Sequence, residues 1–219
     1  MSDTALAHHF EDLEQQHETA SIGMWAFLVQ EVMFFGGLFA VYIVYRNLKA
    51  DAFLEGSSHL DVPLGTFNTA VLIGSSLTMA LAVRTAQLGR RAATAGFIGL
   101  TMVLGIVFLG VKWVEYSHKY HDGLIPGVAW HPGPEAADGL NIFFGLYFAM
   151  TGMHALHMII GMVIMVVVAF RALRGRYSPE NYIGVEVLGL YWHFVDLVWI
   201  FLFPLLYLLS RHVGEGVHP

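Results

Sequence analysis

Five long apolar blocks, separated by polar stretches, are the feature that most constrains the fold of this chain. Each block has a length of about 20 residues or more, which as a helix crosses a bilayer core of about 30 Å. Only 13% of the residues are charged and 56% are hydrophobic, whereas a soluble domain has roughly 25% charged residues. The sequence therefore predicts an all-α, polytopic membrane protein with one five-helix membrane domain over residues 22–209.

The predicted helices form an antiparallel bundle with a short segment on each side of it. Residues 1–21 are an acidic amino-terminal segment without Lys or Arg, and residues 210–219 are a carboxyl-terminal tail. Because Gln87–Arg91 is too short for anything but a tight turn, the second and third helices are expected to form a hairpin. The five predicted helices cover about residues 22–45, 66–86, 93–114, 140–170 and 185–209.

The distribution of Lys and Arg predicts the orientation of the chain in the membrane. The amino-terminal face holds Arg84, Arg90, Arg91, Arg171, Arg174 and Arg176, and the opposite face holds Arg46, Lys49, Lys112, Lys119 and Arg211. The first set lies in two short loops, where the positive-inside rule works best. The amino terminus is therefore predicted in the cytoplasm and the carboxyl terminus outside. The start lacks a signal-peptide pattern, so the first helix is expected to be an uncleaved anchor.

Glu31 is an acid inside the first predicted helix, where no Lys or Arg accompanies it. An ionisable side chain in a bilayer needs a partner, and burial favours its neutral form. Two interpretations stay open for Glu31. It either forms a hydrogen bond that holds neighbouring helices together, or it handles protons or faces lipid.

His154 and His157 lie three residues apart, on one face of the fourth predicted helix. Imidazoles at this spacing could hold a metal, but the chain has no cysteine and no matching Glu-x-x-His elsewhere. They cannot both be axial ligands of one haem, because the two axial ligands bind the iron from opposite sides of the ring. Packed, hydrogen-bonded histidines are favoured. The loop histidines His118, His121 and His131 are typical of a surface and are not predicted to bind metal.

Glu186, His193 and Asp196 form a polar stripe along the fifth predicted helix. His193 and Asp196 are predicted to pair with each other and to stabilise the fold. No catalytic, metal or cofactor-binding residue is predicted in this chain. The absence of a basic patch argues against nucleic acid as a partner. Small residues at Gly36-Gly37 and Gly74–Thr78 predict helix faces buried against another membrane subunit.

Four stretches, in this order, resemble the signature stretches of the cytochrome c oxidase subunit III family: Gln30 to Phe35, Glu115-Tyr116, Thr151 to Gly161 and Tyr191 to Trp199. The resemblance covers His17 to Arg211. The chain is similar to the shorter, bacterial type of this family, which has five helices instead of seven. It implies that Glu31 corresponds to the family's buried glutamate and Glu115 to its helix-end acid. His154, His157, His193 and Asp196 match the family's buried polar positions.

The resemblance implies a subunit of a proton-pumping terminal oxidase of aerobic respiration, in a bacterial plasma membrane. The whole complex would transfer electrons from cytochrome c to oxygen, with haem and copper in partner subunits and no cofactor in this chain. The chain would pack on subunit I beside subunit II, hold phospholipids, support proton uptake and protect the catalytic site. Assembly into a respiratory supercomplex is a further expectation of the resemblance.

Four alternatives stay open. The chain could serve a quinol oxidase, although Glu31 favours cytochrome c as the donor because some quinol-oxidase relatives carry Asp there. It could be an accessory subunit of a nitric-oxide reductase. A membrane di-haem carrier using His154, His157 and His193 is more remote. A small transporter with Glu31 as proton site fits poorly, because transporters are usually built from repeats and none is visible here.

Overall fold

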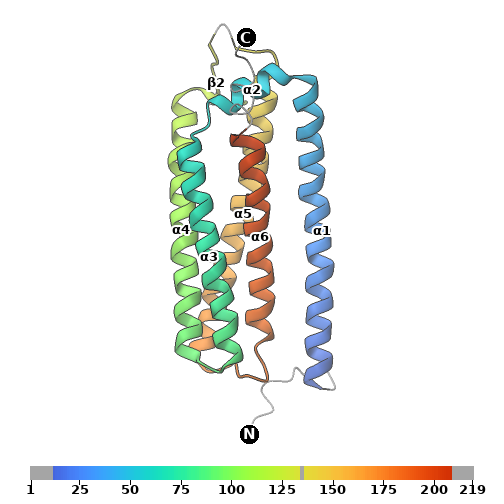
Figure 1. Ribbon diagram of the computed structural model, residues 1–219, viewed down its shortest axis with the longest axis vertical. Coiled ribbons are helices and arrows are strands. Elements are labelled where there is room, and N and C mark those ends of the chain that lie inside the picture. The colour runs from blue at the N-terminus through green and yellow to red at the C-terminus, as the bar shows by residue number, and fades with distance from the viewer. Residues whose placement is uncertain (1–11, 134–135, 209–219) are drawn as a thin grey trace, which may run out of the picture. The chain divides into compact units, whose positions relative to one another are not determined.

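The computed structural model describes residues 12–133 and 136–208, and these form six helices and one two-stranded hairpin (Figure 1). The elements are α1 (Leu13–Leu48), α2 (Ala50–Ser58), α3 (Val62–Gln87), α4 (Arg91–His121), β1 (Leu124–Ile125), β2 (Ala129–Trp130), α5 (Leu140–Leu173) and α6 (Ile183–Tyr207). Five of the described helices, all except α2, are long and apolar enough to cross a membrane. The prediction of an all-α membrane protein with five spans is confirmed.

The first and third spans extend beyond the predicted bounds. Helix α1 begins at Leu13, because the Asp12 carboxylate accepts the Gln15 backbone N–H at 2.7 Å and caps the helix. Helix α4 continues to His121, so the predicted end of the third helix at residue 114 is wrong, and His118 and His121 lie in a helix and not in a loop. Residues 1–11 of the acidic segment and residues 209–219, with the predicted tail, lie outside the part of the chain that the structure describes.

Helix α2 lies in a polar stretch for which the sequence predicted no helix. The buried Phe53 ring of α2 packs edge-on against Tyr42 of α1 and Phe143 of α5, with ring centroids 5.0 and 5.4 Å apart. Gly56 meets the same Phe143 ring so closely that a Cβ at this position would overlap it. Tertiary packing on aromatic rings therefore explains a short helix that local sequence does not reveal.

The long helices contribute to two compact units. Unit 1 comprises Met1–Val32, Leu72–Ile106 and His157–Asp196, and unit 2 comprises Met33–Val71, Val107–Leu156 and Leu197–Pro219. Each unit has its own buried polar cluster, described in the next subsection.

Small and hydroxylated residues join the helix segments inside unit 1. The hydroxyls of Thr78 and Thr101 lie 2.7 Å apart and connect α3 to α4, and Trp192 Nε1–H of α6 donates to Ser75 Oγ at 3.1 Å. Ser75 and Thr78 are thus buried within the chain, so the prediction that Gly74–Thr78 faces another subunit is wrong for them. By contrast, Gly36 and Gly37 face open space.

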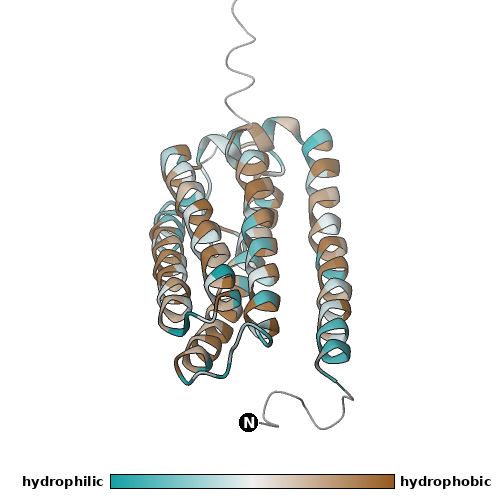
Figure 2. Cartoon of the chain, turned by 60° about the horizontal axis from the view of Figure 1, so that its bottom comes forward, coloured by the Kyte–Doolittle hydropathy of each residue, from teal (hydrophilic) through white to brown (hydrophobic). Residues whose placement is uncertain are grey.

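The surface of the long helices is apolar along most of their length. Figure 2 shows hydrophobic residues along the spans and hydrophilic residues toward the helix ends and connections. Large apolar side chains are exposed, among them Trp113 at 75% and Met33 at 73%. A surface of this kind suits lipid or another membrane subunit, and not water.

The exposed ion pair between Lys49 and Asp138 gives a pH-dependent prediction for unit 2. Lys49 Nζ lies 2.5 Å from Asp138 Oδ2, and its hydrogen bond and charge hold the pKa of Asp138 below the usual 3.8. Because the folded-state pKa is the lower one, the pair stabilises the fold above pH 3.8 and loses this effect as the pH falls. Asp138→Asn is expected to lower the melting temperature slightly near neutral pH, and the difference from wild type should vanish in acid. Thermal unfolding in detergent over a pH series measures it, and a difference that grows in acid would contradict the assignment.

Candidate functional site

Glu31 lies in a buried contact between α1 and α5 of unit 1. Its Oε2 is 3.1 Å from His157 Nε2, and the exposed fractions of the two residues are 8% and 9%. Tyr191 of α6 donates its hydroxyl to the His157 backbone carbonyl at 2.9 Å, which fixes the turn that carries the imidazole. Three helices thus meet at one carboxyl–imidazole pair. The sequence surroundings of Glu31 suggested an isolated acid, but in the structure Glu31 has a histidine partner.

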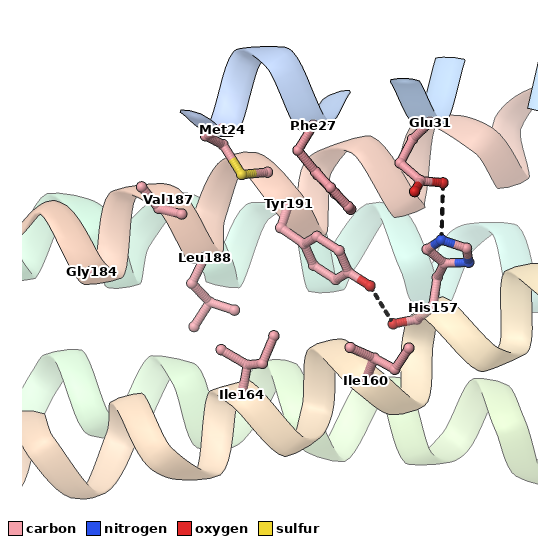
Figure 3. A pocket seen from close by; sticks show the side chains of 10 residues that line it. All are labelled: Met24, Phe27, Glu31, His157, Ile160, Ile164, Gly184, Val187, Leu188 and Tyr191. Atoms are coloured by element: carbon pink, nitrogen blue, oxygen red, sulfur yellow. Dashed lines mark hydrogen bonds and ion pairs between the residues drawn. The ribbon is translucent and has the colours of Figure 1, made fainter. Parts of the chain in front are cut away.

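The Glu31–His157 pair lies at one end of an apolar cavity of about 410 Å³ (Figure 3). The pair is the polar part of a lining that is otherwise almost entirely hydrophobic. The lining residues are Met24, Phe27, Glu31, His157, Ile160, Ile164, Gly184, Val187, Leu188 and Tyr191. A volume of this size is typical of sites for small organic ligands.

A second cavity, of about 610 Å³, shares Gly184 with the first and is basic. Arg171, Arg174 and Arg176 line it together with Tyr177, from the end of α5 and the connection to α6. Burial raises the pKa of the Tyr177 hydroxyl, while the charge and hydrogen bond of Arg171 act in the opposite direction. Guanidinium groups around one hollow suit an anionic group such as a phosphate.

Unit 2 contains a buried ion pair on α4. Lys112 Nζ donates to Glu115 Oε2 at 2.9 Å, and both side chains are almost fully buried. Lys112 also donates to the hydroxyls of Tyr147 of α5 and Tyr207 of α6, at 3.1 and 2.7 Å. These two hydroxyls in turn donate to Glu115 Oε1, at 2.9 and 2.6 Å. The count of Lys and Arg assigned Lys112 to the face opposite the amino terminus. In the structure Lys112 is part of a closed hydrogen-bond network between helices.

Aromatic rings complete the surroundings of Lys112. Its ammonium lies 5.1 to 5.5 Å from the centroids of four rings, which belong to Tyr116, Tyr147, Trp199 and Tyr207. Each of these contacts is within the range of a cation–π interaction. Hydrogen bonds, an opposite charge and aromatic faces together compensate the loss of water, and this network ties α4, α5 and α6 together within unit 2.

The two histidines of α5 have different surroundings. The His154 ring packs against Phe108 and Trp199, at centroid distances of 5.4 and 5.3 Å, whereas His157 reaches Glu31. Within residues 12–133 and 136–208, no three His, Asp or Glu side chains come together as metal ligands.

The polar stripe of α6 is divided between different neighbours. Glu186 lines a third cavity of about 510 Å³ beside His17 and Glu18 of α1. His193 Nδ1 lies 2.8 Å from Ser76 Oγ of α3, so the predicted direct pair of His193 with Asp196 is wrong. Among the described residues, Asp196 has no hydrogen-bond partner. The His193 imidazole forms its hydrogen bond with a hydroxyl of α3 and not with the carboxyl group on its own helix.

Several members of these clusters were not predicted from the sequence. Tyr147 is an ordinary residue of an apolar helix, and no sequence signal distinguishes it. Tyr191 opens the fourth signature stretch, but neither its contact with His157 nor the contact of Tyr207 with Glu115 was predicted. Lys112 carried a signal that could have been used, because a Lys three residues before Glu115 in an apolar block predicts an i, i+3 ion pair.

Comparison with known proteins agrees with this architecture. The chain matches the family model for cytochrome c oxidase subunit III over residues 4–211. Cytochrome c oxidase subunit 3 of Corynebacterium diphtheriae is 34% identical, over 87% of this chain and 88% of the relative. The protein of the same name from Synechocystis sp. is 35% identical, over 85% and 74% of the two chains. Quinol oxidase subunit 3 of Bacillus spizizenii is 30% identical, over 90% and 92%.

Proposed function

Because the chain belongs to the cytochrome c oxidase subunit III family, we propose that it supports a proton-pumping terminal oxidase without carrying a redox centre itself. As a subunit III of the haem-copper oxidases, it associates with other oxidase subunits in a membrane. In the proposed complex it packs directly on subunit I, and subunit II completes the core. Haem and copper belong to these partners, where electrons pass to oxygen. The observation that carries the proposal is the family match along nearly all of a chain with five spanning helices.

Lipid binding is the part of this role that the cavities of unit 1 support. The apolar cavity has the character of an acyl-chain site, and the adjoining arginine cavity has the charge that a phosphate headgroup requires. We assign an anionic phospholipid to the pair of cavities. The Glu31–His157 contact then closes the apolar end and holds α1 against α5, which favours the structural interpretation of Glu31.

The same arginines support the orientation that we propose. Arg171, Arg174 and Arg176 line one connection, and Arg90 and Arg91 lie at the short turn between α3 and α4. Short basic loops stay in the cytoplasm. The proposed location is a bacterial plasma membrane, with the amino terminus in the cytoplasm and the carboxyl terminus outside.

A quinol-oxidizing complex is the second candidate assembly. The relative from Bacillus spizizenii is named as a quinol oxidase subunit and covers 90% of this chain. Cytochrome c is the donor that we propose, since the two relatives with the higher identities, 34% and 35%, are named for it and Glu31 favours it. Subunit II decides the donor, so the composition of the purified complex distinguishes the two.

Affinity purification from native membranes tests the proposed function. We expect a tagged chain to bring out oxidase subunits I and II, with haem and copper in the preparation. The chain expressed alone and purified without partners is expected to show neither metal, by haem spectrum and by metal analysis. Stoichiometric haem or copper in the partner-free chain, or recovery of the native chain as an active monomer, would overturn the proposal.

A further inference from the structure

The hydroxyl group of Tyr207 is hydrogen-bonded to a carboxylate in the interior of unit 2. It donates to Glu115 Oε1 at 2.6 Å, and the two residues are 0% and 2% exposed. A second phenol, that of Tyr147, donates to the same oxygen at 2.9 Å. A phenol that loses an electron becomes a strong acid, and a hydrogen-bonded carboxylate is placed to receive its proton. The contact therefore suits a coupled transfer of one electron and one proton.

Lys112 has the surroundings to hold the charge that such a transfer leaves behind. Its ammonium is paired with Glu115 Oε2 at 2.9 Å, and it loses this opposite charge once Glu115 takes up a proton. Three aromatic rings besides that of Tyr207 then remain around Nζ, at centroid distances of 5.1 to 5.5 Å, those of Tyr116, Tyr147 and Trp199. Cation–π attraction is strongest where water is excluded, so these rings stabilise the ammonium in the oxidised cluster.

Oxidisable rings connect Tyr207 to the edge of unit 2. The ring centroids of Tyr207 and Tyr147 are 6.5 Å apart, and those of Tyr147 and Tyr116 are 6.0 Å apart. Tyr207 and Tyr147 are fully buried, whereas Tyr116 is half-buried. Separations of about 4.5–7 Å are those of aromatic rings in contact, and an electron crosses them without movement of the side chains. An oxidant at the surface can therefore draw an electron from Tyr207 without entering the helix bundle.

We propose that Tyr207 is a radical-forming residue, which gives an electron to a strong one-electron oxidant and its phenolic proton to Glu115. The oxidant is a partially reduced oxygen species such as the hydroxyl radical, which oxygen reduction can release. The O–H bond of Tyr207 breaks and a new O–H bond forms at Glu115 Oε1, while the hydroxyl radical takes up the electron and becomes hydroxide. The products are a neutral phenoxyl radical, a neutral carboxylic acid and hydroxide.

This reaction goes beyond the proposed function, because it lies outside the electron path from donor to oxygen. That path belongs to the partner subunits, whereas Tyr207 removes an oxidising equivalent that has escaped from it. The inference depends only on the contacts inside unit 2, so it is independent of the electron donor of the complex.

Photo-oxidation of the purified complex by a photoexcited ruthenium complex and an electron acceptor tests the proposal. Electron paramagnetic resonance and infrared difference spectra should show a tyrosyl radical that appears together with the carbonyl band of a protonated carboxyl group. Both signals should fall in Tyr207→Phe and be lost when Tyr147→Phe is added, since the two phenols share Glu115. Tyr120→Phe is the matched control, because Tyr120 is a 54% exposed phenol on the same helix as Glu115, and it should leave the carboxyl band unchanged.

Removal of the proton acceptor tests the second half of the step. The double variant Lys112→Met with Glu115→Gln removes both charges and leaves the Tyr207 phenol in place. A positioned base accelerates proton transfer by about a hundredfold or more, so radical formation should slow by about this factor. The carboxyl band should be absent from the double variant, and heavy water should slow radical formation in wild type.

Three results would overturn the proposal. The first is an unchanged radical signal in Tyr207→Phe, which would assign the radical to other phenols. The second is a wild-type radical that forms without a carboxyl band, and the third is a wild-type rate in the double variant. If Tyr207→Phe does not assemble, the infrared band of wild type and the rate of the double variant decide the question.

Discussion

Replacing Lys112 by methionine is expected to remove this subunit from the purified oxidase, because Glu115 would remain as a buried charge without its ammonium partner. Removing one member of a buried pair typically costs about 3–5 kcal/mol. The loss should extend to α5 and α6, since Tyr147 and Tyr207 donate to the same carboxylate. Thermal unfolding of the complex and the amount of subunit retained after purification measure the effect.

The double variant Lys112→Met with Glu115→Gln measures the interaction energy between the two residues, apart from the effect of each single substitution. It leaves no unpaired charge, so it should be clearly less damaging than the sum of the two single variants. Lys49→Met is the matched control, because Lys49 is partly exposed and its pair with Asp138 lies at the surface. A small loss is expected there. Strict additivity of Lys112 and Glu115 would show that the network does not act as a unit.

Glu31→Gln is expected to leave the complex assembled and pumping, whereas Glu31→Ala should loosen the subunit. Glutamine keeps an oxygen that can accept from His157 Nε2, but alanine leaves a cavity and removes this contact of the imidazole, at a cost of about 1–3 kcal/mol. Proton pumping and subunit retention in reconstituted vesicles measure both variants.

His157→Ala is the reciprocal test of this contact. It should loosen the subunit about as much as Glu31→Ala, and combining the two should cost little more than either alone. An obligatory proton relay gives a different pattern, because glutamine cannot carry a proton. A Glu31→Gln variant that assembles fully and does not pump would therefore refute the structural role of Glu31.

The number of spans and the fold class were determined by the sequence alone. A block of about 20 apolar residues has to become a membrane helix, because only a helix satisfies the backbone inside a bilayer. The family was accessible for a similar reason, since its four motifs are continuous stretches that can be recognised without any contact between helices. Charge counts in short loops gave an orientation, which stays a prediction.

The partners of the buried polar residues were decided only by the tertiary structure. Glu31 and His157 are 126 positions apart, Lys112 and Tyr207 are 95 apart, and His193 and Ser76 are 117 apart. Helical periodicity states which residues share a face of one helix, but not which neighbouring helix that face meets or at what height. For this reason His193 forms a hydrogen bond with Ser76 and not with Asp196. Glu31, which looked isolated in its own helix, has a histidine beside it.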